Sequence, residues 1–359
     1  MALQNSKRQS AFLVLALIVG TLTGAAIGAG SVFYFKTMKP KFNHQIRLLT
    51  YRKWLSAPMI ERFLNDEKIL IEQDVATSSS DFFSRLSDPT HDYDLVSIAS
   101  WQIPSAIDTH LLEPLKKGEI PLLRLIAADF RQLPQDRDLF YSVPLFWGAN
   151  GIVYNKTKVG KKIQSWVDIF NDPNILAHTA LLNEPREIMS GLIRRNSLSE
   201  KSIADDGSNL KKSLNDILPF AKYSAVQALK LLGKEDVWVA ELPQGLASIP
   251  LARNSDYIFV LPDESATLWT ESLVIAKGTN KSAQVYRFIN YLLQKDVARS
   301  LVQQTHMATT LTSLEDEVLH PMLKASYVRS LPLNKLQVIE PINHMAKQWE
   351  DAISSATLN

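Results

Sequence analysis

Aromatic and acidic side chains stand at the ends of several predicted strands, which is where open α/β sheets usually hold their ligands. They are Tyr51, Trp54, Trp101, Glu184, Glu187, Trp269 and Glu271. A carboxylate neutralises an ammonium group, and an aromatic face attracts a cation by about 0.5–2 kcal/mol, depending on exposure. This set therefore predicts a binding site for an organic cation.

Each of these residues also has an interpretation that involves no ligand. A single tryptophan packs in the core or on the surface more often than it lines a binding site. Glu184 and Glu187 flank Pro185 at a predicted helix start, where acidic residues favour the helix dipole without any ligand. It is the joint placement of the set at strand ends that favours a ligand site.

Catalytic and metal-binding signatures are missing from the sequence. It contains no GxSxG, no GxxxxGK[ST] and no HExxH. The seven histidines, among them His44, His91, His178 and His306, are scattered without ligand spacing. The sequence thus predicts a binding protein rather than an enzyme, with no cofactor and no metal.

Strands that alternate with helices must position these residues, and this alternation predicts an α/β fold with a parallel sheet. The first expected strands are residues 46–51, 69–75 and 93–98, with helices at 58–64 and 78–86 between them. Further expected elements are strands at 151–154, 179–182 and 271–275 and helices at 165–170 and 187–195. A periodic apolar stripe predicts one long helix over 281–304.

Composition excludes several classes of partner and anchor. The net charge of +2, with 21% charged residues, gives no broad basic field of the kind that nucleic-acid binders use. The absence of cysteine excludes a lipid anchor through cysteine, any disulfide and any thiolate metal site. The chain beyond residue 35 is long enough for two packed lobes of roughly 100–200 residues each.

Residues 11–35 carry no charge and, at about 1.5 Å per residue, can cross a hydrocarbon layer of about 30 Å as a helix. Lys7 and Arg8 precede them without any acidic residue, which favours a cytoplasmic N-terminus of residues 1–10. A cleaved signal peptide is the alternative, because small residues at 24–26 and 28–30 offer cleavage sites. A retained anchor is favoured because residues 32–35 remain apolar.

Three glycines of this segment recur every four residues, at Gly20, Gly24 and Gly28. On a membrane helix this spacing forms one face on which two helices can approach closely, so it allows a homodimer. Glycine is also common in membrane helices without such a role.

Segments spread along the chain resemble the spermidine/putrescine-binding receptors of bacterial ABC importers, a group of extracytoplasmic solute-binding proteins. The resemblance runs from about Ile46 to Thr310. Its clearest pieces are YDLV at 93–96, YSVPLFWGANG at 141–151, LLNEPRE at 181–187, LWTESL at 268–273 and FINYLL at 288–293. Their order and spacing carry the resemblance, since each piece alone is weak.

The resemblance implies a two-lobed α/β fold of the type II periplasmic-binding-protein class, whose lobes close on the ligand about crossover strands. Lobe 1 would comprise residues 45–142 and 272–306, and lobe 2 residues 143–271 and 307–359, after a transmembrane or signal helix at 11–35 and a linker at 36–44. The ligand-binding positions would be Tyr51, Arg52, Trp54, Trp101, Glu184, Glu187, Trp269 and Glu271. Glu271 would grip a terminal ammonium of a polyamine, and Glu184 and Glu187 its other amines.

The chain departs from this family at three places. The first loop usually reads Asn-Trp-x-x-Tyr, whereas residues 50–54 here are TYRKW, which adds two cations. Pro243 and Gln244 stand where the family has a tryptophan, and Met307 stands where a tyrosine is expected. A smaller, differently charged or partly anionic solute that uses Arg52 therefore stays open beside the polyamine.

The function that these features indicate is an extracytoplasmic receptor, in the periplasm or anchored at the membrane, which captures a small organic cation and presents it to an ABC permease. One alternative is a membrane-tethered sensor or interaction module with a diverged solute-binding domain. A tethered enzyme is another, although no nucleophile or base can be named for it.

Overall fold

The computed structural model describes residues 44–76, 79–183, 217, 219–234, 236–263, 266–331 and 336–337. The chain divides into two compact units, Met1–Gln45 and Ile46–Asn359. The predicted membrane segment, with Gly20, Gly24 and Gly28, lies outside the described residues, so the anchor and the homodimer stay predictions. No helix in the described part of the chain is long and apolar enough to span a membrane.

The first elements match the predicted alternation of strands and helices. They are β1 (Gln45–Thr50), α2 (Ala57–Glu67), β2 (Leu70–Val75), α3 (Ser79–Ser87) and β3 (Leu95–Ala99). Pro58 stands in the first turn of α2, where it costs no hydrogen bond, and Lys68 ends the helix in a left-handed conformation (φ 59°). β1 and β3 pair in parallel, as this alternation predicts.

The remaining elements complete the sheet and its covering helices. The strands are β4 (Leu112–Glu113), β5 (Ser142–Asn155), β6 (Thr179–Leu182), β7 (Ala221–Tyr223), β8 (Val239–Pro243), β9 (Tyr257–Val260), β10 (Ala266–Ala276), β11 (Ala308–Thr309) and β12 (Leu336–Gln337). The helices are α4 (Ile103–Asp108), α5 (Lys156–Val159), α6 (Trp166–Phe170), α7 (Pro173–Ala177), α11 (Ala225–Leu231), α12 (Gln244–Arg253), α13 (Ser282–Leu292) and α14 (Lys295–Thr305). Short 3-10 helices are η1 (Ser100–Gln102), η2 (Lys117–Glu119), η3 (Pro121–Leu125), η4 (Ala128–Phe130), η5 (Arg137–Leu139), η6 (Thr312–Leu314), η7 (Pro321–Leu323) and η8 (Ala325–Ser330).

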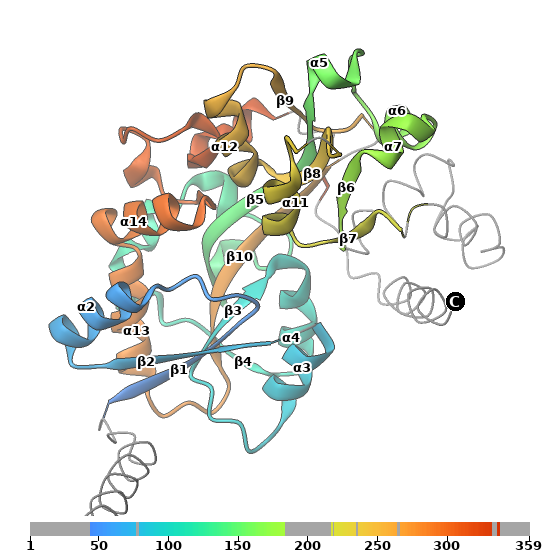
Figure 1. Cartoon of the computed structure of the whole chain (residues 1–359). Coiled ribbons are helices and arrows are strands. Elements are labelled where there is room, and N and C mark those ends of the chain that lie inside the picture. The colour runs from blue at the N-terminus through green and yellow to red at the C-terminus, as the bar shows by residue number, and fades with distance from the viewer. Residues whose placement is uncertain are drawn as a thin grey trace, which may run out of the picture. The chain divides into compact units, whose positions relative to one another are not determined.

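The sheet is mixed, which corrects the prediction of a parallel sheet. Its strands follow the order β2-β1-β3-β10-β5-β8-β6-β7. β10 runs antiparallel to β3 and to β5, and β5 runs antiparallel to β8, whereas β6 pairs in parallel with β8. The alternation of strands and helices describes only neighbours in the sequence, and β10 inserts between β3 and β5 from a distant part of the chain (Figure 1).

Apolar clusters lie at both ends of this strand order, and β5 contributes to both ends. Phe146 and Trp147 pack with residues of β1 and α13, whereas Ile152 and Tyr154 pack with residues of α6 and β6. β5 therefore links two cores. This arrangement is compatible with two lobes, and their boundaries stay a prediction.

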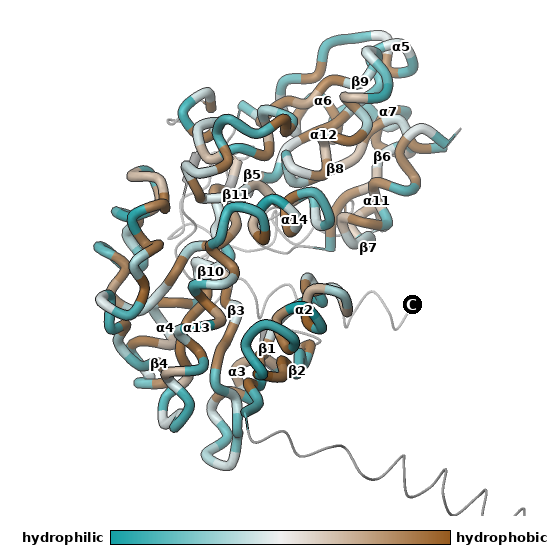
Figure 2. Tube along the Cα trace, turned by 90° about the vertical axis from the view of Figure 1, so that its left-hand side faces the viewer, coloured by the Kyte–Doolittle hydropathy of each residue, from teal (hydrophilic) through white to brown (hydrophobic). Residues whose placement is uncertain are grey.

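The predicted helix over 281–304 is two helices, α13 and α14. Gln294, with φ −64° and ψ 140°, leaves the helical conformation between them. The buried residues of α14 are out of phase with those of α13 at 3.6 residues per turn, because the positions that would continue the α13 stripe are the polar residues Asp296, Arg299 and Gln303. The apolar stripe that predicted the helix therefore ends at Leu293, just before the break. In Figure 2, α2 and α14 alternate between hydrophilic and hydrophobic residues, as expected of helices with one face on a core.

Gly245, near the start of α12, gives a test of the packing around β11. A Cβ at this position would lie 2.0 Å from the carbonyl oxygen of His306, and neither backbone can move away easily. We expect Gly245→Ala to lower the free energy of unfolding by about 1–3 kcal/mol in urea denaturation. Gly118→Ala is the control, because a Cβ there would have nothing within 4 Å. Equal urea-denaturation midpoints for the two variants would contradict the close approach of Gly245 to the backbone of His306.

Candidate functional site

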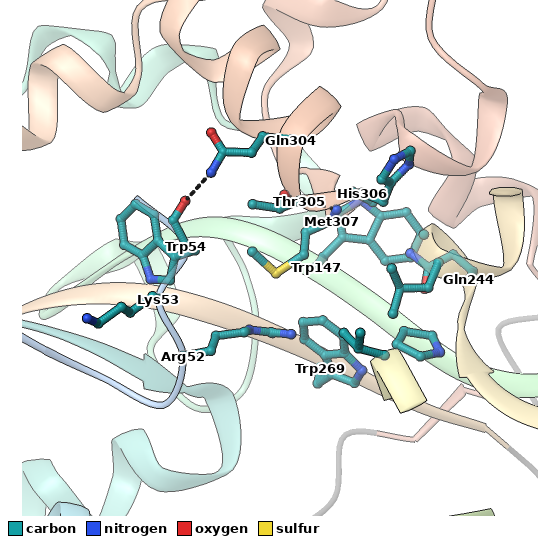
Figure 3. Close-up of a pocket in the computed structure, with 15 residues that line it drawn as sticks. Arg52, Lys53, Trp54, Trp147, Gln244, Trp269, Gln304, Thr305, His306 and Met307 are labelled. Atoms are coloured by element: carbon teal, nitrogen blue, oxygen red, sulfur yellow. Dashed lines mark hydrogen bonds between the residues drawn. The ribbon is translucent and has the colours of Figure 1, made fainter. Parts of the chain in front are cut away.

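A cavity of about 260 Å³ lies where several strand ends and helix ends meet (Figure 3). Its walls come from the loop after β1, from β5 and β10, from α11, from the junction of β8 with α12, and from the end of α14 with β11. The lining residues are Arg52, Lys53, Trp54, Trp147, Val226, Pro243, Gln244, Gly245, Leu246, Trp269, Gln304, Thr305, His306, Met307 and Ala308. Its size suits a small organic solute.

Trp269 is held on one wall by the pairing of β10 with β5. Trp269 lies opposite Gly148 in the register of the two strands, and a Cβ at Gly148 would lie 2.1 Å from the indole ring. The indole can therefore lie directly on the backbone of β5, where its Nε1 donates to Oδ1 of Asn150 at 3.2 Å. The contact with the β5 backbone and the hydrogen bond to Asn150 together fix the indole of Trp269 on the cavity wall.

Glu271 and Arg52 form an ion pair beside this ring. Nη2 of Arg52 donates to Oε2 of Glu271 at 2.9 Å, and Oγ of Ser97 donates to Oε1 at 2.6 Å. Glu271 is 6% exposed, whereas the side chain of Arg52 is 48% exposed. The carboxylate that the resemblance assigns to a ligand ammonium is thus neutralised by the chain itself, and it lies outside the cavity lining.

Three buried donors of the cavity lining have no hydrogen-bond partner among the described residues. They are Nε1 of Trp54, Nε1 of Trp147 and Nε2 of Gln244. The other amide atom of Gln244, Oε1, accepts from the backbone N of Ala149 at 2.5 Å, which fixes the amide. An unpaired buried donor costs about 1–3 kcal/mol. Three such unpaired donors around one cavity indicate a binding site in which a ligand supplies the missing hydrogen-bond acceptors.

Of the predicted site residues, Arg52, Trp54 and Trp269 line this cavity. Tyr51 instead stacks on Phe82, with ring centroids 4.6 Å apart, and its hydroxyl accepts from Nε2 of Gln102. Trp101 is half-buried in η1 and is not part of the lining. Glu184 and Glu187 lie outside the described residues.

The predicted set omitted several residues of the lining, including Trp147, Gln244 and Met307. Gln244 directly follows β8, so the strand-end argument that selected the other residues also applies to it. Gln244 and Met307 are positions where the chain departs from the polyamine receptors. The departures at the first loop, at 243–244 and at 307 therefore meet around one cavity.

His306 is the half-buried histidine of the lining, and it caps α14 with a left-handed backbone (φ 52°). Burial lowers the pKa of His306, and the charge of Arg253 lowers it further. The neutral imidazole is therefore favoured in the folded protein at neutral pH.

His306 should make stability depend on pH. Its pKa is lower in the folded chain than in the unfolded chain, where it is about 6.5. The unfolded chain then binds more protons, so stability is retained above about pH 6.5 and falls as the pH drops through the folded-state pKa. We expect His306→Asn to reduce the loss of stability between about pH 7.5 and 5.5 in urea denaturation.

His110→Asn controls for placing asparagine at a left-handed position, because His110 is exposed and has φ 56°. An unchanged pH dependence in His306→Asn would refute the assignment to His306.

Two long antiparallel strands, β5 and β10, with apolar cores toward both ends of β5 and a cavity lined by Trp147 and Trp269, are compatible with a solute receptor of the periplasmic-binding-protein type. The chain belongs to the bacterial extracellular solute-binding protein family, whose profile matches residues 94–337. It is thus a solute-binding protein of an ABC transporter, working outside the cytoplasm, and not an enzyme. The family resemblance predicted from the sequence is confirmed.

Spermidine/putrescine-binding periplasmic protein 1 of Haemophilus influenzae is 22% identical over 266 residues, covering 72% of this chain and 73% of that protein. The spermidine/putrescine substrate-binding protein PotD of Streptococcus pneumoniae has a similar structure, with a TM-score of 0.70 at 19% identity, covering 88% of this chain and 99% of that one. The binding protein AgtB of A. tumefaciens R10, solved with agropinic acid, gives a TM-score of 0.59 at 15% identity, covering 87% and 96%. The two structures are similar in fold.

Proposed function

We propose that the cavity between Trp54, Trp147 and Trp269 binds the solute that this receptor delivers to a membrane permease. The three buried or half-buried indoles offer apolar walls to the body of a small molecule. The unpaired donors of Trp54, Trp147 and Gln244 supply the polar groups that a ligand would complete. This coincidence of apolar walls and unpaired donors carries the proposal.

The sequence favours a polyamine-like cation, captured between two lobes, as the solute. Distant relatives that are named for spermidine and putrescine support this ligand, as do the tryptophan faces of the cavity. The described lining, however, contains no aspartate and no glutamate. A cation would therefore need Glu184 or Glu187, or would have to displace Arg52 from Glu271.

Val226 offers a direct test of the cavity, because it lines the wall and is 53% exposed. We expect Val226→Trp to fill the cavity and abolish solute binding while leaving the fold intact. Thermal shift with a panel of polyamines, amino acids, organic acids and sugars measures this, since a ligand at 100 times its Kd stabilises by about 2.7 kcal/mol.

Val318→Trp is the matched control, because Val318 is fully exposed and lies outside the lining. Retention of ligand shifts in Val226→Trp would place the binding site elsewhere.

We propose further that residues 11–35 stay attached and hold the receptor at the membrane. The chain has no cysteine for lipidation, and this segment is the apolar stretch long enough for a membrane helix. Residues 36–44 then set how far the domain can reach from the membrane. A tethered sensor or interaction module would require the same retention.

The full-length chain should fractionate with membranes, and its intact mass should include the N-terminal segment. Mass spectrometry of the exported protein measures this directly. A mature chain that begins after residue 30 would show cleavage and a freely diffusing receptor.

A further inference from the structure

Both oxygens of the Glu271 carboxylate already accept hydrogen bonds from the chain itself. Oε2 accepts from the guanidinium of Arg52 and Oε1 accepts from the hydroxyl of Ser97, and the residue is 6% exposed. A buried charged group stays beside its counter-charge, because an uncompensated charge in the interior is strongly unfavourable. In this structure the carboxylate of Glu271 therefore pairs with the guanidinium of Arg52 and holds it in place.

Arg52 carries positive charge on the cavity wall. Its Cζ lies 6.0 Å from the ring centre of Trp269, and Figure 3 shows the side chain extending toward that ring while Lys53 turns to the opposite side. A guanidinium has five N–H donors, and the hydrogen bond to Glu271 is the one that the guanidinium of Arg52 makes within the described part of the chain. The other donors are available to an acceptor.

The neighbouring groups favour the same ligand chemistry. Indole N–H and the amide NH₂ of glutamine donate but do not accept, so the unpaired atoms of Trp54, Trp147 and Gln244 all require acceptors. These three side chains are at most 1% exposed, so small side-chain shifts would have to bring their donors to a ligand. Acidic residues are missing from the described lining, whereas Arg52 and Lys53 belong to it.

We propose that the solute is a small organic carboxylate with an apolar body, and that Arg52 binds its carboxylate while Glu271 positions the guanidinium. The inference rests on the proposed function of this cavity. A planar guanidinium matches a carboxylate in geometry as well as in charge, and the tryptophans enclose the rest of the molecule. Because Glu271 is paired with Arg52, the cavity presents a guanidinium to the solute in place of a carboxylate, and so it recognises an anion in place of an ammonium.

Calorimetric titration of the purified chain with matched straight-chain acids, amides and amines of about four to eight carbons tests this ligand class. We expect the acids to bind about 10- to 100-fold more tightly than their amides, since a hydrogen bond to a charged group accounts for such a factor. The amines, putrescine and spermidine should not bind. Binding of amines or polyamines without the acids would overturn the proposal.

Arg52→Gln removes the charge and keeps an amide donor, but it leaves the buried Glu271 without a counter-charge, so the variant should also be less stable. We expect it to reduce the ratio of acid to amide affinity to about one, which a merely structural role would not do, because such a role would weaken both ligands alike. Arg131→Gln is the matched control and should leave the ratio within about two-fold, because Arg131 is exposed and lies outside the cavity lining.

Glu271→Gln adds a second measurement. Acid binding should persist in this variant, because the amide can still accept from Arg52, whereas an ammonium site at Glu271 would be lost. An unchanged acid-to-amide ratio in Arg52→Gln refutes the carboxylate. Polyamine binding that Val226→Trp blocks would retain the cavity as the solute site and remove only the carboxylate. Failure of every solute to bind would remove both.

Discussion

The antiparallel pairing of β5 with β10 is the constraint on which the rest of this structure depends. All fourteen residues of β5 are buried, and the two strands pair from Leu268 opposite Ala149 to Val274 opposite Ser142, with one register shift between Glu271 and Ser272. A slip of one residue would turn each side chain to the opposite face, so burial on both sides fixes the register. That register lays Trp269 on Gly148 and presents Glu271 to the neighbouring strand β3.

Two buried carboxylates, those of Glu271 and Asp94, are paired with donors from other parts of the chain. Glu271 pairs with Arg52 and Ser97, and Asp94, which is 3% exposed, pairs with Lys281 at 2.9 Å and with Thr279 at 2.7 Å. Burial makes an unpaired charge expensive, so each acid recruits a donor from a distant part of the chain. At Glu271 this requirement also brings a cation to the cavity wall.

Local patterns predicted the first elements of the fold well. β1, α2, β2 and β3 lie within a few residues of their expected positions, because strand and helix periods and the proline at 58 are local properties. The long helix over 281–304 was wrong, because the apolar stripe that predicted it ends at Leu293 and Gln294 breaks the helix before α14. The parallel sheet was wrong in part, because neighbours in the sequence do not determine that β10 enters between β3 and β5.

The sequence by itself determined the class of protein, since the matched segments span most of the chain, and it marked Arg52, Trp54 and Trp269 as candidates for a binding site. It also identified the positions that depart from polyamine receptors. Only the tertiary structure decided that Arg52 reaches Glu271 across 219 residues of sequence, and that Gln244 and Met307 meet the tryptophans at one cavity. The spacing of apolar and polar residues indicates which of them share a face of a helix or strand. The partner of a buried charge depends instead on which strands the fold brings together.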